Sequence, residues 1–373
     1  MDSNSLGFRS LEISIAILKK LESIAKYYRD SYVFSFRTSD VKARVKRIGG
    51  GYQGSDTEYR DTVLRYWRKY GIKPKRIWYS LLCDGKDAYD PRFVPDSIWF
   101  HDIIPFYNNT KINYAYADKG IYNRLLPNVS KPQTVVKRMA GYYYNGDSEQ
   151  PISRDEAETL LAGEEHLIFK PSFGAKASGI RFYDRDEKEN DRLLRILNSM
   201  GSNFVVQRIV KQHPDLARLN PDSLNTIRVL SFRFKGEVHI LSAQLRIGAA
   251  GSRVDNVSAG GSACSIKSDG FLYEKSVTRQ STWTDETPSG IKLSTIRVPN
   301  YEGIMETVKR LHTELPYFDL LGWDFAVGED GTPIMVEYNT LPGQNQIGSG
   351  EPTFGDLTDE VFDEVFLRKT KKR

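Results

Sequence analysis

The stretch that decides the fold is residues 322–339, which read GWDFAVGEDGTPIMVEYN. Two apolar segments, Leu320–Val327 and Pro333–Asn339, lie on either side of the turn sequence at 328–331. Short apolar runs separated by a Gly- and Asp-containing turn are typical of an antiparallel β-hairpin. The sequence therefore predicts two neighbouring strands here.

Three oxygen-bearing side chains lie in these strands. Side chains alternate between the two faces of a strand. Glu337 and Asn339 therefore share one face of the second strand, and Asp324 lies on one face of the first strand. Two carboxylates and an amide oxygen are hard ligands that suit Mg²⁺ bridging nucleotide phosphates. The alternative is a hairpin whose acids face solvent. Because Asp324 and Glu337 interrupt apolar strands, we favour a protected cleft.

A second motif is the apolar strand Ile168–Pro171, followed by the small-residue loop 172–180. Lys170 supplies a point charge, and a loop of Gly, Ala and Ser lets backbone N–H groups approach a phosphate. The loop does not have the Walker A pattern. The alternative interpretation is a flexible hairpin tip.

Two further stretches carry arginines in predicted strands. Arg228 lies within Asn225–Val229, and Arg246 precedes the Gly-rich segment 253–261. Arginines on a sheet, beside a loop that contains Asn and Gly, are suited to holding phosphate or carboxylate oxygens. The alternative is that they are ordinary charged strand positions.

Other chemistries have little support in the sequence. Residues 49–54 (GGGYQG) formally match a dinucleotide fingerprint, but the preceding segment is basic and not an apolar strand, so we interpret them as a loop. The five histidines have no metal-ligand spacing, and no Gly-x-Ser-x-Gly elbow is present. Zinc chemistry and serine hydrolysis are therefore not indicated.

Away from the hairpin, the patterns predict a mostly helical unit over residues 1–110. It contains an amphipathic helix at 11–28 and a second at 56–70, with Asp56 as N-cap and Gly71 as the stop. Beyond residue 118 helices and strands alternate. The predicted helices are 118–126, 153–162, 187–200 and 301–314, and the other predicted strands are 133–136, 166–170, 203–207, 226–234 and 238–247.

The composition limits the class of protein. The net charge is +5, with acidic and basic residues interspersed, and we interpret the basic tail at 368–373 as solvated surface rather than a nucleic-acid site. The two cysteines exclude a disulfide framework. No apolar run approaches the ~20 residues needed to span a bilayer. We expect a cytoplasmic protein with no transmembrane segment and no nucleic-acid partner; the oligomeric state is not indicated.

Taken in this order, the segments resemble an ATP-grasp domain over about residues 75–355. They are most similar to the sugar-transfer-associated ATP-grasp branch, to which Asp90–Pro95 and Asp118-Lys119 also bear likeness, and more distantly similar to glutamate ligases. The resemblance implies an α+β ATP-grasp fold, with two lobes gripping ATP, after the helical unit. The expected lobes are 111–208, with the phosphate loop, and 209–373, with the Mg site.

The resemblance also implies roles for individual residues. It assigns Mg²⁺ to Asp324, Glu337 and Asn339, and the reacting phosphate to Arg228. The implied ATP-binding residues are Lys119 and Lys170 on the phosphates, Gly174, Ala177, Ser178 and Gly179 in the closing loop 172–180, and the adenine hinge Gln207, Arg208, Ile209 and Val210.

This sequence departs from the family pattern at two positions. Many relatives carry Glu where Gln207 stands, which affects the adenine contact. Several ligases place an Arg two residues before the metal Asp, where this chain has Gly322. Two interpretations stay open: Arg228 or Arg246 takes that role, or the acceptor chemistry differs from that of those ligases. The candidate catalytic residues are Lys170, Arg228 and Arg246.

The family reaction forms an acylphosphate from ATP and a carboxylate, and an amine or another nucleophile then displaces phosphate. The resemblance thus implies a ligase that uses ATP and Mg²⁺ on a small-molecule or glycan-linked carboxylate, in cell-envelope or capsular polysaccharide synthesis. Two alternatives stay open: an ATP-grasp phosphotransferase acting on a sugar or alcohol, and a nucleotide-binding scaffold without turnover.

Overall fold

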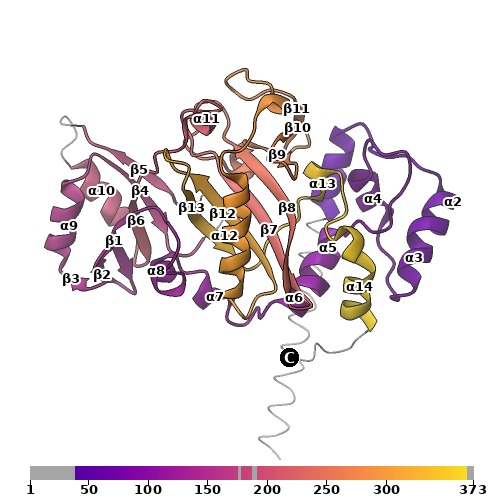
Figure 1. The fold of residues 1–373 in the computed structure, drawn as a ribbon, viewed down its shortest axis with the longest axis horizontal. Helices are drawn as coiled ribbons and strands as arrows, with labels where there is room; N and C mark the ends of the chain where they lie inside the picture. Colours follow the sequence, from indigo (N-terminus) through magenta and orange to yellow (C-terminus); the bar gives the residue numbers. More distant parts are fainter. Residues whose placement is uncertain (1–37, 175–177, 187–190, 368–373) are drawn as a thin grey trace, which may run out of the picture. The chain divides into compact units, whose positions relative to one another are not determined.

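The computed structural model describes residues 38–174, 178–186 and 191–367, and it divides into two compact units between Asp102 and Ile103 (Figure 1). The helix predicted at 11–28 and the basic tail at 368–373 lie outside the described residues.

The first unit is helical in the part that the structure describes. Its elements are a helix over 38–47, then α2 (Asp56–Tyr59), a π-helical turn (Arg60–Leu64), α3 (Arg65–Arg68), α4 (Arg76–Leu82), α5 (Asp96–Ile98) and a π-helical turn (Trp99–Ile103). The segment from α2 to α3 is one continuous helix that buries Tyr59, Val63 and Trp67.

The predicted N-cap of this helix is wrong by one residue. The Ser55 hydroxyl accepts a hydrogen bond from the Glu58 N–H, and Ser55 is extended, so Asp56 is the first helical residue. A serine at this position satisfies an orphan N–H as well as Asp56 would, and it leaves the acid in the first turn, where the helix dipole favours it. The stop at Gly71 is confirmed by its φ of +70°.

The glycine run at 49–54 is a loop within this unit. Gly49, Gly50 and Gly51 all have positive φ, and a Cβ on Gly51 would lie 2.1 Å from the Ser80 carbonyl oxygen. A helix rather than a strand precedes the run, so the dinucleotide interpretation is excluded as predicted.

The second unit contains two antiparallel sheets (Figure 1). The first has the order β3-β2-β1-β6-β4-β5. Its strands are β1 (Thr134–Met139), β2 (Tyr142–Asn145), β3 (Pro151–Ile152), β4 (His166–Pro171), β5 (Arg181–Asp184) and β6 (Phe204–Arg208). Helices α9 (Arg154–Ala162) and α10 (Arg192–Ser199) pack on it and bury Ala157, Leu161, Leu193 and Leu197.

The second sheet has the order β11-β10-β9-β8-β7-β12-β13. Its strands are β7 (Ile227–Phe234), β8 (Glu237–Ile247), β9 (Ser262–Ile266), β10 (Leu272–Thr278), β11 (Trp283–Thr284), β12 (Leu320–Val327) and β13 (Pro333–Asn339). Helix α12 (Tyr301–Thr313) lies along β7, β8, β12 and β13 and buries Ile304, Val308 and Leu311 against them (Figure 1).

Short helical turns complete the second unit. They are α6 (Ile104–Tyr107), α7 (Asn113–Tyr116), η3 (Lys119–Ile121), α8 (Tyr122–Leu125), α11 (Pro214–Ala217), η4 (Val257–Ala259), η5 (Leu293–Thr295), α13 (Gln346–Ser349), η6 (Gly355–Leu357), α14 (Thr358–Phe362) and η7 (Asp363–Leu367). No helix in the described ranges combines the length and apolarity that a membrane crossing requires.

The hairpin predicted at 320–339 is confirmed. β12 and β13 are antiparallel, with Asp324 opposite Glu337 and Gly322 opposite Asn339. The turn closes with a hydrogen bond of 2.9 Å from Gly328 N to Thr332 O. One face of β12 carries Trp323 and Phe325, which are fully buried. Asp324 lies between them in sequence, so it lies on the opposite face.

Candidate functional site

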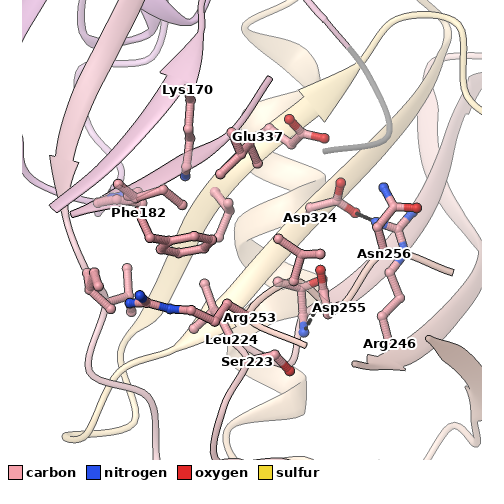
Figure 2. A pocket seen from close by; sticks show the side chains of 18 of the residues that line it. Lys170, Phe182, Ser223, Leu224, Arg246, Arg253, Asp255, Asn256, Asp324 and Glu337 are labelled. Carbon is pink, nitrogen blue, oxygen red and sulfur yellow. Dashed lines mark hydrogen bonds and ion pairs between the residues drawn. The ribbon is translucent and has the colours of Figure 1, made fainter. Parts of the chain in front are cut away.

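A large cavity lies between the two sheets of the second unit (Figure 2). Its walls come from β4 and β5 on one side and from β8, β12 and β13 on the other. It contains about 1240 Å³ of free space, counted out to its open mouth.

The predicted metal residues share one face of the hairpin. Asp324 and Glu337 are direct cross-strand partners and both line the cavity. Asn339 lies two residues further along the same face, and its buried Nδ2 has no hydrogen-bond partner. Turning the Asn339 amide over exchanges its oxygen and nitrogen. The position can therefore offer an oxygen to a cation or an N–H group to a phosphate oxygen.

Three cations surround the two carboxylates. Arg228 Nη1 lies 2.9 Å from Asp324 Oδ1, and Arg246 Nη1 lies 3.2 Å from the same oxygen. Lys119 Nζ lies 3.2 Å from Glu337 Oε2. Burial raises the pKa of Asp324, although both arginines oppose the shift, whereas Lys119 and Arg228 outweigh burial and lower the pKa of Glu337. Within this pair, Glu337 is the carboxylate that stays ionised, and Asp324 is the one that takes up a proton more easily.

Gly322 makes room for Arg228. A Cβ at this position would lie 3.4 Å from Arg228 Cζ and 3.0 Å from Pro342 Cβ. The guanidinium of Arg228 therefore lies over the glycine. Burial, helped by Arg246, lowers the pKa of Arg228, whereas Asp324 and Asp255 outweigh burial and raise the pKa of Arg246.

Lys170 faces these groups from β4, the opposite wall of the cavity (Figure 2). Among the described residues it has no carboxylate within ion-pair distance. Burial lowers its pKa to about 8, even though Glu337 opposes the shift. A partly buried ammonium without a counter-ion is destabilised unless an anion joins it, so the site favours an anionic ligand.

The predicted phosphate loop borders the same cavity. Gly174 and Ser178 line it. Gly179 has a φ of +76°, and a Cβ there would lie 2.9 Å from Pro171 Cγ, so only glycine fits without a shift. Ala177 lies outside the described residues.

The predicted adenine hinge divides into two parts. Arg208, Ile209 and Val210 line the cavity, and the last two follow the end of β6, so the sheet ladder does not use their backbone groups. The Gln207 side chain instead donates to Thr134 Oγ1 at 3.2 Å and lines a smaller neighbouring cavity. The adenine contact proposed for Gln207 would be made by its backbone atoms, and it stays a prediction.

Sequence reasoning missed Asp255 as a cavity residue. Its Oδ2 accepts hydrogen bonds from the backbone N–H and the hydroxyl of Thr226, and burial raises its pKa. It lies in the segment 253–261, which stood out only for its Gly and Asn content. Asp255 interrupts no apolar strand, so the sequence contains no signal for its burial.

The residues present fit a magnesium–nucleotide complex. Two carboxylates and an amide offer oxygen ligands, and Lys119, Lys170 and the arginines offer charge for phosphates. Within the part of the chain that is described, no cluster of three or more His, Cys, Asp or Glu side chains suits a metal, and the assignment of Mg²⁺ to Asp324, Glu337 and Asn339 stays a prediction.

Two sheets that enclose a cavity with this ligand set define an ATP-grasp fold. The chain belongs to the sugar-transfer-associated ATP-grasp family, whose profile matches residues 100–359. The resemblance inferred from sequence is therefore confirmed, although Asp90–Pro95 lies outside the matched range. A search of curated proteins by sequence gives no match.

Solved structures with a related chain path are distant in sequence. The biotin carboxylase domain of Hydrogenobacter thermophilus 2-oxoglutarate carboxylase is 12% identical, with a TM-score of 0.44 over 72% of this chain and 49% of that chain. The ATP-grasp ligase PsnB, solved with a minimal precursor, Mg and ADP, is 13% identical, with a TM-score of 0.39 over 69% and 62%. D-alanyl-alanine synthetase A from Vibrio cholerae is 11% identical, with a TM-score of 0.39 over 66% and 62%. The chain thus spans between half and two thirds of each of these structures.

Proposed function

We propose that this protein is a Mg-ATP-dependent ligase that activates a carboxylate as an acylphosphate for attack by an amine or another nucleophile. The observation that carries the proposal is that Lys170, which has no counter-ion among the described residues, faces the Asp324–Glu337 pair across one cavity. A triphosphate and a divalent cation are the ligands that complement both walls at once.

Each wall has a distinct part in the reaction. Asp324, Glu337 and Asn339 would hold Mg²⁺, which supplies charge neutralisation at the β- and γ-phosphates. Lys119 and Lys170 bind the phosphates as point charges. The hinge backbone at Ile209 and Val210 receives the adenine edge, as the family resemblance implies.

Chemistry begins when a carboxylate oxygen of the substrate attacks the γ-phosphorus and ADP leaves. Negative charge builds between the two reactants and is stabilised by two fixed positive charges: Arg246, which lines the cavity, and Arg228, which pairs with Asp324 beside it. An amine then attacks the acyl carbon, the bond from carbon to the phosphate oxygen breaks, and inorganic phosphate leaves. No protein nucleophile is needed in either step.

The substrate is proposed from the family's association with sugar transfer. We place a glycan-linked or small-molecule carboxylate in the open mouth of the cavity, within envelope or capsular polysaccharide synthesis. A dependence on the cellular ATP pool puts the reaction in the cytoplasm.

The test is an ADP-release screen with Mg-ATP against sugar acids, amino acids and nucleotide sugars, each with and without hydroxylamine. A ligase gives ADP and a hydroxamate, because hydroxylamine traps the acylphosphate. Glu337→Gln should abolish both signals by removing a metal ligand. Glu302→Gln is the matched control, since Glu302 pairs with Arg297 on the exposed face of α12 and should retain full activity.

Two results would redirect the assignment. ADP release with a phosphorylated alcohol and no hydroxamate would establish the phosphotransferase alternative. A thermal melt of the parent protein that Mg-ADP leaves unshifted would count against both enzymes.

A further inference from the structure

One contact spans the mouth of the cavity from one sheet to the other. Arg253, in the loop after β8, places Nη1 2.5 Å from Asp184 Oδ2 and Nη2 3.3 Å from Asp184 Oδ1. Its guanidinium also lies 4.1 Å from the centre of the Phe182 ring. Asp184 and Phe182 belong to β5, the edge strand of the first sheet, and Figure 2 shows the Arg253 side chain directed toward the Phe182 ring.

Both partners of the cation–π contact, Arg253 and Phe182, line the nucleotide cavity. The loop that carries Arg253 also carries Asp255 and Asn256, which line the cavity nearer the Asp324 carboxylate. The contact therefore joins a wall of the cavity in the first sheet to the loop that completes the floor in the second.

The loop is held firmly on its own sheet. The Asn220 Nδ2 donates to the Gly248 and Ala249 carbonyls, and Thr226 holds Asp255. A Cβ on Gly261 would lie 2.7 Å from the Asp255 carbonyl oxygen, so the loop returns to β9 by a path that only glycine fits. Because this backbone is fixed, Arg253 keeps a constant position relative to the second sheet. The hydrogen bonds from Arg253 to Asp184 on β5 therefore tie the first sheet to the second.

Asp184 also has a hydrogen-bond partner within its own sheet. His166 Nδ1, on the neighbouring strand β4, lies 3.0 Å from Asp184 Oδ1, and the two residues are cross-strand partners. Arg253 is the partner that comes from the other side of the cavity. The two contacts to one carboxylate can therefore be separated by mutation.

We propose that Arg253, Asp184 and Phe182 form a latch that holds the two sheets closed around bound nucleotide, with Arg253 as a positioning residue for the proposed reaction. The inference rests on the proposed binding of Mg-ADP and Mg-ATP. Without the latch, the closed arrangement loses population, so nucleotide escapes faster and binds more weakly.

The expected effect is modest, because the ion pair is partly exposed, with 38% of each side chain accessible. An exposed ion pair and one cation–π contact each contribute on the order of a few-fold to an equilibrium. Together they predict that ADP dissociates about tenfold faster from the Arg253→Gln variant.

The experiment measures dissociation of a fluorescent ADP analogue with Mg²⁺ by stopped flow, on the full chain. The variants are Arg253→Gln, Asp184→Asn and their double, with His166→Gln as the matched control. A latch predicts that Arg253→Gln releases ADP about tenfold faster and that Asp184→Asn, which keeps the Phe182 contact, releases it a few-fold faster. The double variant should be no faster than Arg253→Gln, and the control should match the parent. Parental rates in the single variants, or effects that multiply in the double, would overturn the latch.

A second measurement separates failure of the latch from failure of the proposed function. Hydrogen exchange of the nucleotide-free protein should speed up at β5 in Arg253→Gln, but not in His166→Gln, whereas the loop 249–261, which its own sheet holds, should be unchanged in both. If the parent protein binds no Mg-ADP, the proposed function is wrong. Hydrogen exchange still tests the contact in that case, because unchanged exchange in Arg253→Gln would show that Arg253 does not hold the two sheets together.

Discussion

Replacing Lys170 by methionine is expected to stabilise the nucleotide-free protein while removing nucleotide binding. The pKa of Lys170 falls from 10.5 to about 8 because burial disfavours its charge. At ~1.4 kcal/mol per pKa unit, the charged lysine destabilises the native state by about 3 kcal/mol near neutral pH. Methionine retains the apolar stem and has no charge, so we expect a gain of about 1–3 kcal/mol and a rise in Tm of several degrees.

The gain has a defined pH dependence. The native-state pKa is the lower one, so the unfolded chain binds more protons between pH 8 and about 10.4. Wild-type stability therefore rises with pH relative to Lys170→Met in that window. The advantage of the variant is full below pH 8 and shrinks by about 1 kcal/mol per pH unit above it. Urea unfolding of both proteins at pH 7 and pH 9 measures the difference.

A matched control comes from a second buried lysine. Lys137 on β1 is 1% exposed, but it pairs with Glu149 and donates to the Gly120 carbonyl at 2.8 Å. Lys137→Met leaves Glu149 without its buried partner and should destabilise the protein by roughly 3 kcal/mol. Mg-ADP affinity should fall at least tenfold in Lys170→Met by loss of a charged phosphate contact. A Lys170→Met protein that is less stable than wild type at pH 7, or that binds Mg-ADP with wild-type affinity, would refute the reasoning.

Three further predictions concern pH, the cavity floor and a helix cap. Mg-ADP binding to the wild type should weaken by up to tenfold per pH unit above about pH 8, since phosphate binds protonated Lys170, and calorimetry in buffers of different ionisation enthalpy should detect proton uptake. Gly322→Ala should destabilise the protein by about 1–3 kcal/mol, because the added Cβ would lie 3.0 Å from Pro342 Cβ and would also touch the Arg228 guanidinium at 3.4 Å. Turnover should fall if Pro342 and Arg228 shift to make room, and unchanged turnover would show that the site absorbs the change. Ser153→Ala removes the capping box of α9 and should lower stability by about 1 kcal/mol in urea unfolding with no change in Mg-ADP affinity, and a weaker affinity would indicate coupling from α9 to the cavity.

The sequence by itself determined the parts of this protein that depend on neighbours along the chain. Strand alternation and one turn were enough to place Asp324, Glu337 and Asn339 on a common face, and the register of β12 with β13 agrees. The strands β1, β4, β6, β7, β8, β12 and β13 and the helices α9 and α12 were predicted to within a few residues, because apolar periodicity is a local property. The strands β2, β3, β5, β9, β10 and β11 were not predicted. The Ser55 cap shows the limit of such reasoning, since two adjacent residues had nearly equal capping ability.

Tertiary structure alone decided which charges meet. Lys119 reaches Glu337 across more than two hundred residues of chain, Gly322 leaves space that Arg228 fills, and Arg253 finds Asp184 on the other sheet. Gln207 turns away from the cavity because Thr134 on the neighbouring strand offers it a partner. These pairings follow from how two sheets pack and from which side chains lose their water there, and neither packing nor desolvation can be read from the spacing of residues along one strand.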